Sequence, residues 1–307
     1  MKITDFKTLH ETLKGSEKVK VVIAGAKEEE ISLAWQARDL ADFILLGDQE
    51  EMQSCMEKHD IDAACFEMVH LEDYNKAATT AIQLIHEGKA DLPMKGNIQT
   101  SAFMSAVLNK EHGLKRESRL SQITLFDDTK TQHSGIKFLT DCAINLDMSL
   151  AVKQDIIKNA VLLAQLFGIQ CPKVALLSAV ETVKEAMPDT LDSAILTQMN
   201  KRGQIKGCLI DGPLSLDNAI SKEAAIQKGI ISEVAGVADI LVGSCLQESN
   251  SLSKSLNFYG NLETASVIVG TKQPIIMTSR TDATVNKINS IAATCFYQNQ
   301  LKSRRQS

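Results

Sequence analysis

The chain has 307 residues, which is enough for two domains of ordinary size, each with its own core. Its hydrophobic fraction of 44% and charged fraction of 23% are typical of a soluble globular protein. A formal net charge of -5 gives no basic footprint for nucleic acid. No apolar run is long enough to span a bilayer, and the first residues lack a secretory apolar core. We therefore expect a cytoplasmic protein that binds neither nucleic acid nor membrane.

Cysteines and histidines exclude several kinds of site. The seven cysteines are scattered without a C-x-x-C pair, which is typical of buried thiols in a reducing compartment. All six histidines lie at or before His133, so the C-terminal half has no imidazole for a Ser-His-Asp triad or a local metal site. No Walker loop and no G-x-G-x-x-G occurs. The sequence predicts no metal and no resident cofactor.

Strand-like and helical segments alternate along the chain. Most strand-like runs are continuously apolar, as in strands that helices cover on both faces. Helical spacing is clearest at 31–38, 79–87 and 150–167. The pattern predicts doubly wound α/β architecture with an antiparallel element. The predicted strands are 20–24, 43–46, 123–126, 136–139, 174–177, 209–212, 240–242, 267–269 and 275–277.

The segment from Ala265 to Ala293 is the strongest candidate for chemistry. After its two short strands, apolar residues recur at helical spacing at Val285, Ile288, Ala292 and Cys295, so a helix is expected just after Arg280, capped by Thr281 or Asp282. Ser279 and Arg280 then occupy a strand-to-helix turn, which suits an anion such as phosphate. The alternative is a capped helix whose Arg280 and Asp282 pair at the surface.

Four predicted strand ends carry a polar or charged group in a tight turn. Ligands of open α/β sheets gather at the carboxyl ends of strands, although a lone Lys-Gly or Asp-Gly-Pro is more often only a turn. The ends are Met94-Lys95-Gly96-Asn97, Thr140-Asp141, Asp211-Gly212-Pro213 and Thr278-Ser279-Arg280. Glu28, Glu29 and Glu30 follow the first strand instead, and their charges argue against a nucleotide there.

Taken together and in this order, the motifs resemble the phosphate acetyl/butyryltransferase family, and the phosphate butyryltransferase branch most closely. The resemblance covers nearly everything after about residue 80 and, more loosely, the first 80 residues. The stretches that carry it are P-M-K-G-N-I-Q-T (93–100), A-V-L-N-K-E-H-G-L (106–114), T-D-C-A-I-N-L (140–146), P-K-V-A-L-L-S-A-V-E (172–181), M-P-D-T-L-D-S-A (187–194), R-G-Q-I-K-G (202–207), D-G-P-L-S-L-D-N-A-I-S (211–221), V-A-G-V-A-D-I-L-V (234–242) and P-I-I-M-T-S-R-T-D (274–282).

The resemblance implies two doubly wound α/β domains, similar to the isocitrate/isopropylmalate dehydrogenase fold, with an interdomain cleft. The first domain would comprise 1–140 and 283–307, and the second 141–282. The implied reaction is acyl-CoA + phosphate ⇌ acyl phosphate + CoA for short or branched acyl groups such as butyryl. Coenzyme A is a substrate in it, no metal is needed, and the implied assembly is a homodimer or a higher homo-oligomer.

Family roles can be carried to matching positions. Ser279 would hydrogen-bond the reacting groups, Arg280 would hold phosphate bidentately, and Asp282 would take the proton of the CoA thiol. Other family positions suggest further phosphate and substrate or CoA contacts. The phosphate candidates are Lys95, Gly96 and Lys115, and the substrate or CoA candidates are Asp211, Asn218, Asn250 and Lys254.

Several departures from the family pattern leave alternatives open. Gln247-Glu248-Ser249-Asn250 replaces a Glu-Ala-Gly-Asn turn, and strain at Ser249 would follow if that glycine needed a positive φ. Lys115 and Gln122 replace an arginine and a histidine, and Asn286 lies nearer than Asp282 to the acid of the acetyl branch. One alternative is an impaired paralogue that binds CoA or acyl phosphate. Another is a metal- and NAD-dependent dehydrogenase of the same fold.

Overall fold

The computed structural model describes residues 2–116, 118–129, 131 and 133–306. Its contacts divide the chain into two compact units, which are described separately. Unit 1 comprises Met1–Phe6 and Ser118–Thr264, and unit 2 comprises Lys7–Glu117 and Ala265–Ser307. The predicted domain boundaries at residues 140 and 282 stay a prediction. The compact units differ from this prediction, because 118–140 belongs to unit 1 and 265–282 belongs to unit 2.

Unit 2 is built on a parallel sheet. Its strands are β1 (Val19–Ala24), β2 (Ala41–Gly47), β3 (Glu67–His70) and β4 (Leu92–Lys95), in the order β3-β2-β1-β4. Each neighbouring pair is parallel. The side chains of β1 and β2 are almost all buried, as their continuous apolar runs predict for strands covered on both faces.

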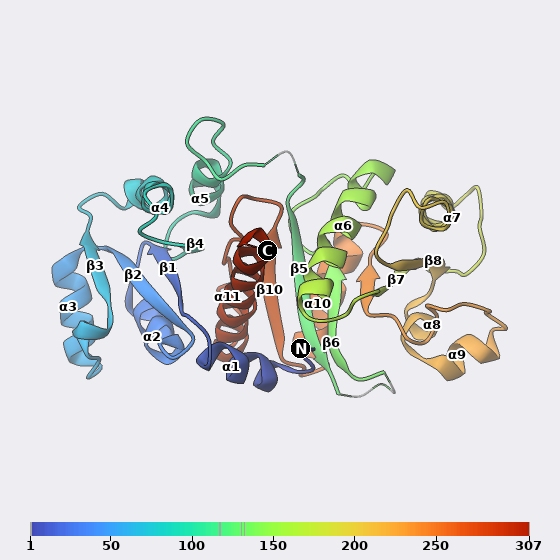
Figure 1. The fold of residues 1–307 in the computed structure, drawn as a ribbon, viewed down its shortest axis with the longest axis horizontal. Helices are drawn as coiled ribbons and strands as arrows, with labels where there is room; N and C mark the ends of the chain where they lie inside the picture. The colour runs from blue at the N-terminus through green and yellow to red at the C-terminus, as the bar shows by residue number, and fades with distance from the viewer. Residues whose placement is uncertain (1, 117, 130, 132, 307) are drawn as a thin grey trace. The chain divides into compact units, whose positions relative to one another are not determined.

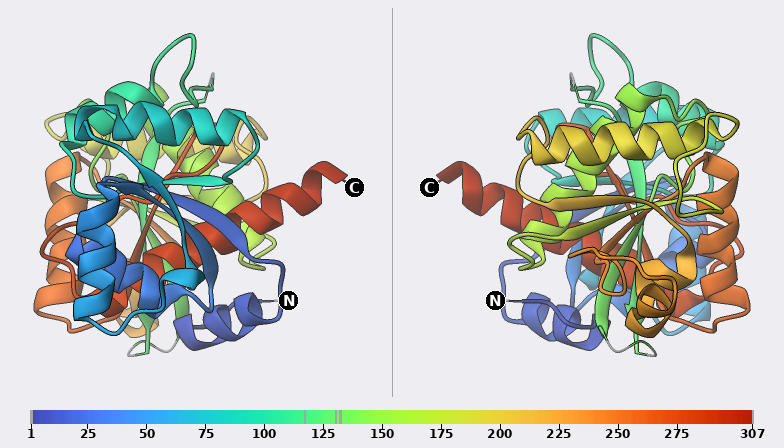
Figure 2. Two further views of the ribbon diagram at one scale, coloured as in Figure 1. Left: turned by 90° about the vertical axis from the view of Figure 1, so that its left-hand side faces the viewer. Right: turned by 90° about the vertical axis from the view of Figure 1, so that its right-hand side faces the viewer.

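The helices of unit 2 cover both faces of this sheet. They are α2 (Glu28–Ala37), α3 (Gln49–Lys58), α4 (Ala77–His86), α5 (Thr100–Val107) and α11 (Thr284–Gln306), and α1 (Phe6–Lys14) precedes the first strand. Right-handed crossovers place α2 and α3 on one face and α4 on the other, because the strand order reverses at β4 (Figure 1). Helix α4 contacts β1, β2 and β4, whereas α11 contacts α2, β1 and β2. Figure 2 shows that α11 continues past the sheet towards the C-terminus.

The chain returns to unit 2 through β10 (Thr264–Val269) and the segment after it. Ile268 forms an antiparallel bridge with Ile275, and Ile276 forms a parallel bridge with Met94 of β4. The Lys95 amide donates to the Ile276 carbonyl at 3.0 Å. The predicted strand 275–277 is therefore present only as isolated bridges, but these bridges are enough to place the following Ser279-Arg280 turn beside the end of β4.

Unit 1 contains a mixed sheet. Its strands β5 (Ser121–Asp128), β6 (Gly135–Thr140), β7 (Lys173–Leu177), β8 (Leu209–Leu214) and β9 (Ile240–Val242) lie in the order β5-β6-β9-β7-β8. The β5–β6 pair is antiparallel, and the β6–β9, β9–β7 and β7–β8 pairs are parallel. The predicted α/β class and its antiparallel element are confirmed.

Helices cover the sheet of unit 1 as well. They are α6 (Leu150–Leu166), α7 (Pro188–Lys201), α8 (Leu216–Ile220), α9 (Lys222–Gln227) and α10 (Leu246–Phe258). The predicted helix 150–167 is confirmed as α6, which contacts β5, β6 and β9. Helix α8 contacts β7, and α10 contacts β6 (Figure 1). Within the described residues, no helix is both long and apolar enough to cross a membrane.

The start of α11 differs from the sequence prediction. The helix begins at Thr284, because the Asp282 carboxylate accepts from the Ser279 amide at 2.9 Å and closes a turn instead of capping the helix. Its buried face also differs. Val285 is 43% exposed, whereas Asn286, Asn289 and Ser290 are buried. Ala292 and Cys295 are fully buried as the apolar spacing predicted, whereas Ile288 is half-buried and Val285 is exposed, and polar side chains share the buried face.

The predicted altered turn at 247–250 is helical. Gln247, Glu248, Ser249 and Asn250 form the first turns of α10, and the Glu248 carboxylate accepts from the Ser244 amide at 2.6 Å. Among the described non-glycine residues, positive φ occurs at Asp60 and Asn261 and not at Ser249. The conditional expectation of strain at Ser249 is therefore not met. Gly243 makes room for this path, since a Cβ there would lie 2.1 Å from the Ser249 hydroxyl oxygen.

Candidate active site

The carboxyl ends of β1 and β4 are held against each other by glycines. The Gly96 amide donates to the Ala24 carbonyl at 3.1 Å, and the Asn97 amide donates to the Gly25 carbonyl at 2.7 Å. A Cβ at Gly96 would lie only 2.4 Å from the Gly25 carbonyl oxygen. The close approach of these two backbones therefore requires glycine at position 96. It also places Lys95 at the edge where ligands of parallel sheets bind.

A pocket of about 200 Å³ opens at this edge, wholly within unit 2. Its lining is polar and charged, and it includes three cations from separate parts of the chain. The residues that line it are Glu29, Glu30, Lys95, Gly96, Asn97, Thr278, Ser279, Arg280 and Lys287. The structure thus brings together Lys95, Gly96, Ser279 and Arg280, which were predicted from the sequence, in one anion-attracting site.

Lys95 is fixed in place by the backbone around it. Its ammonium donates to the Gly96 carbonyl at 3.0 Å and to the Ile98 carbonyl at 3.1 Å. Burial lowers the pKa of Lys95, and the Arg280 charge lowers it further, while Glu30 and Glu29 oppose this shift. A positive charge that is partly desolvated and faces a second cation is stabilised by any anion that binds between them.

The Ser279-Arg280 turn is closed by its own side chains. Besides the bond from the Ser279 amide to Asp282, the hydroxyls of Ser279 and Thr281 lie 3.0 Å apart. Arg280 is an exposed residue, yet it lines the pocket and perturbs Lys95. Asp282 is half-buried and does not line the pocket. The structure therefore shows Asp282 in a turn-closing position.

Two carboxylates of α2 balance part of the positive charge. Glu30 accepts from the Lys27 amide at 3.1 Å and so closes a capping box at the helix start. Burial raises the pKa of Glu30, although the hydrogen bond from Lys27 opposes the shift. Glu29 forms an ion pair with the ammonium of Lys287, which is buried on α11. Glu29 and Glu30, whose charges argued against a nucleotide at the start of α2, are thus bonded to Lys287 and to the Lys27 amide.

The structure places the remaining candidates elsewhere. Lys115 lies in unit 2 and bridges to Thr271, but it is exposed and does not line the pocket. The four substrate or CoA candidates lie in unit 1, where their side chains or neighbours form local bonds. Asp211 accepts from the Gly212 amide, Asn218 is buried and donates to Glu181, Asn250 donates to the Cys142 carbonyl, and Lys254 is exposed on α10. Their predicted role in binding stays a prediction.

Sequence reasoning missed Lys287, Glu29 and Glu30 as lining residues of the pocket, and it named Asn97 and Thr278 only as parts of predicted strand ends. For Lys287 a signal was present, because a lysine one turn into a helix that begins beside Arg280 lies near the same strand end. Glu29 could not be found in this way, since its pairing with Lys287 joins residues far apart in the chain.

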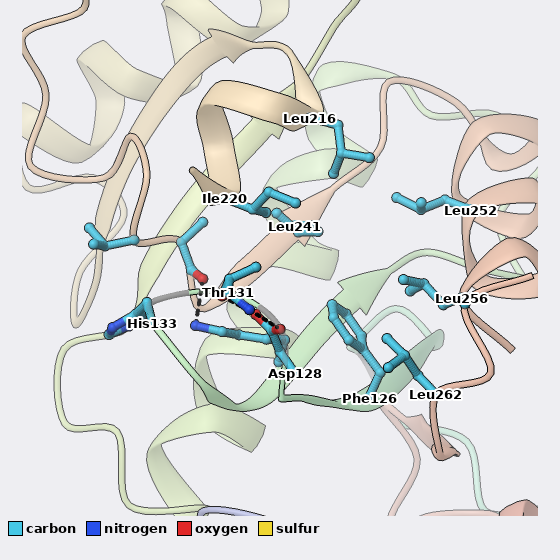
Figure 3. Close-up of a pocket in the computed structure, with 14 residues that line it drawn as sticks. Phe126, Asp128, Thr131, His133, Leu216, Ile220, Leu241, Leu252, Leu256 and Leu262 are labelled. Atoms are coloured by element: carbon cyan, nitrogen blue, oxygen red, sulfur yellow. Dashed lines mark hydrogen bonds between the residues drawn. The ribbon is translucent and has the colours of Figure 1, made fainter. Parts of the chain in front are cut away.

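A second cavity, of about 230 Å³, lies in unit 1 and has a different character. Figure 3 shows leucines of α8 and α10 and Phe126 of β5 around it, with Asp128, Thr131 and His133 at one end. The polar groups at that end bond to their neighbours: His133 contacts Asp239 at 3.0 Å, and Lys137 donates to the Ala238 carbonyl at 3.0 Å. None of the predicted site residues line this cavity, and its leucine-rich wall does not suit phosphate.

Among the described residues, no group of three or more His, Cys, Asp or Glu is placed to hold a metal ion. The pocket of unit 2 offers instead an arginine, two lysines and a hydroxyl at a strand-to-helix turn. Such a set stabilises the charge of a phosphoryl group as it is transferred or displaced.

The chain is similar to a known family and to individual known proteins. The family model for phosphate acetyl/butyryl transferases matches residues 70–295. A phosphate butyryltransferase of Clostridium acetobutylicum is 41% identical over 94% of this chain and 97% of its own length. A branched-chain phosphotransacylase from Enterococcus faecalis, known as a crystal structure, has a TM-score of 0.81 and 32% identity over 91% of this chain and 99% of its own.

A third relative concerns the fold alone. The 4-hydroxythreonine-4-phosphate dehydrogenase of Klebsiella pneumoniae matches 92% of this chain and 100% of its own, with a TM-score of 0.52 and 12% identity. The dehydrogenase-like fold expected from the sequence is confirmed by this likeness, which carries no argument about activity. Because the family model and the relatives with higher identity cover most of the chain, the protein belongs to the phosphate acetyl/butyryltransferase family and is an acyltransferase.

Proposed function

We propose that this acyltransferase exchanges CoA and phosphate on short or branched acyl groups, with the pocket of unit 2 as its phosphoryl site. The supporting observation is that Lys95 and Arg280 line one pocket at the carboxyl edge of a parallel sheet, close enough for Arg280 to lower the pKa of Lys95. The printed names of the relatives, phosphate butyryltransferase and branched-chain phosphotransacylase, support the acyl class. The substrates would be acyl-CoA, phosphate and acyl phosphate, with no resident cofactor.

In the proposed reaction, the sulfur of CoA attacks the carbonyl carbon of the acyl phosphate, and the bond from that carbon to the phosphate oxygen breaks. Phosphate leaves with the electron pair, and the thiol proton passes to a base. Arg280 and Lys95, which line the pocket with Ser279, stabilise the charge on the leaving phosphate, and the Ser279 hydroxyl hydrogen-bonds the reacting groups. A thiol with a pKa of about 8.5 is mostly protonated at neutral pH, so the base contributes about 10²–10⁴-fold.

Asp282 is the proposed base. Its carboxylate lies at the Ser279-Arg280 turn, and one of its oxygens already accepts from the Ser279 amide. We also propose that the protein is cytoplasmic and forms a homodimer or a higher oligomer, as the family resemblance implies, and that Lys115, Asp211, Asn218, Asn250 and Lys254 help to hold the substrates.

Substitution of Arg280 tests the phosphoryl site. Arg280→Ala should lower kcat/KM for phosphate-dependent release of CoA from butyryl-CoA by at least about 100-fold, because a donor to the transition-state charge is lost. Arg280→Lys should recover only part of this, since lysine cannot bind phosphate bidentately. The assay measures free CoA thiol against phosphate concentration over a panel of acyl-CoA chain lengths.

The matched control is Arg202→Ala, which removes an exposed arginine at the end of α7 in unit 1. It should retain the activity of the unmodified enzyme. An Arg280→Ala enzyme with full activity would reject the pocket as the phosphoryl site and leave only membership of the family.

A further inference from the structure

Lys287 is a third cation of the pocket. It lies one turn into α11, is only 8% exposed and lines the pocket with Lys95 and Arg280. Among the described residues, the Lys287 ammonium forms an ion pair with the Glu29 carboxylate. A lysine that is buried in this way and bonded to one acceptor has donor capacity left for a ligand, since an ammonium carries three N–H groups.

Glu29 is the more exposed partner of this ion pair. Its side chain is 60% exposed, whereas that of Lys287 is 9% exposed, so Glu29 can turn to water while Lys287 cannot. Glu29 belongs to the first turn of α2, where the carboxylate that closes the capping box is that of Glu30.

The charges of the pocket are consistent with the replacement of the Glu29 carboxylate by a phosphate. Three cations face two carboxylates while Glu29 is paired with Lys287. When Glu29 turns to solvent, three cations face the carboxylate of Glu30 alone. The remaining two positive charges balance a phosphate dianion, and an anion that replaces Glu29 restores the lost pairing of Lys287.

We propose that Lys287 binds the phosphoryl group together with Lys95 and Arg280, and that Glu29 occupies the position of a phosphate oxygen until phosphate replaces it. Glu29 is then a positioning residue, because it acts through Lys287. This assignment rests on the proposed function, since it takes the same pocket as the phosphoryl site. It predicts that removing the charge of Lys287 weakens phosphate binding, whereas removing the charge of Glu29 tightens it.

Inorganic phosphate binding to the full-length protein tests the proposal, measured by calorimetry and, in turnover, as separate KM values for phosphate and butyryl-CoA. Lys287→Met should weaken phosphate binding about 10- to 100-fold, the effect of losing one hydrogen bond to a charged group. Lys287→Arg should recover much of it. Glu29→Gln should tighten phosphate binding by a few-fold, because the competing anion is removed. The KM for butyryl-CoA should move much less than the KM for phosphate.

Lys302→Met is the matched control. Lys302 lies on the same helix and forms an ion pair with Asp91 at 2.5 Å, outside the pocket. It should leave phosphate affinity unchanged. Should Lys287→Met be poorly folded, Glu29→Gln still decides, because it breaks the same pair without removing a cation. Weaker phosphate binding in Glu29→Gln would mean that the pair is merely structural and would overturn the proposal.

Arg280→Ala, measured in parallel, separates this proposal from the proposed function. Lost phosphate binding in Arg280→Ala with normal binding in a folded Lys287→Met would overturn the role of Lys287 and leave the phosphoryl site intact. Normal binding in both variants would overturn the phosphoryl site itself, and the role of Lys287 with it.

Discussion

Asp282 closes a turn in the structure, and we propose in addition that it is the catalytic base, so one substitution can affect both functions. Its position near Arg280 supports the proposed task of accepting the thiol proton, and the structure places one of its oxygens on the Ser279 amide. A variant that loses both functions would not reveal which one matters. Asparagine separates them, because its amide oxygen can still accept from Ser279 but cannot take up a proton at neutral pH.

We therefore expect Asp282→Asn to keep the turn and lose the base. Its kcat should fall about 10²–10⁴-fold, the usual contribution of a positioned base, with the KM for phosphate changed little. Asp282→Ala should show the same loss in kcat and in addition a raised KM for phosphate, since the turn that carries Arg280 loosens. The measurement is the pH dependence of kcat and KM for both variants. An Asp282→Asn enzyme with normal kcat would place the base elsewhere.

Among the elements, the site depends on where β1, β4 and the bridged segment 275–276 end. The segment after β10 bridges to β4, and β4 pairs with β1, so the turns that follow Ile276, Lys95 and Ala24 share one edge. Gly96 permits this, because its hydrogen takes the place where any Cβ would meet the Gly25 carbonyl. The α/β alternation and most strands were predictable from apolar runs alone. The pairing of 275–276 with β4 was not, since no local signal relates segments so far apart in the chain.

Gly96→Ala should separate the β1 and β4 turns. We expect a loss of about 1–3 kcal/mol in the free energy of unfolding, as for other overpacked positions. Phosphate affinity should fall as well, because Lys95 moves with the turn. Gly15→Ala is the control, since a Cβ there would meet its nearest atom at an ordinary 3.8 Å. Thermal unfolding and phosphate titration check both variants. Equal stability of Gly96→Ala and the unmodified protein would contradict the packing argument.

At the scale of the whole molecule, burial decides the chemistry of the thiols. Cys142, Cys208 and Cys295 are buried, and Cys65 and Cys171 are exposed. Burial raises the pKa of Cys142 and of Cys208 to about 12, so neither forms a reactive thiolate at neutral pH. The prediction of buried thiols is confirmed for these three and is wrong for Cys65 and Cys171, which are exposed.

Titration with an aromatic disulfide at pH 8 should therefore modify Cys65 and Cys171 first. The three buried thiols should react only after denaturation, when all seven become accessible. Peptide mapping by mass spectrometry at increasing times gives the order. Early modification of Cys142 in folded protein would contradict the packing described for unit 1, where it belongs to the hydrophobic core.

Local patterns and ordered motifs were enough to predict the family, the α/β class and the residues of the Ser279-Arg280 turn. The sequence also identified Lys95 and Gly96 through their place after a strand. The three-dimensional contacts were needed to show that Lys287 and Glu29 line the same pocket, that α11 begins at Thr284 and that Asp282 closes a turn. The physical reason is that an ion pair, a buried face and a close backbone approach depend on which distant segments meet, and apolar periodicity carries no information about that meeting.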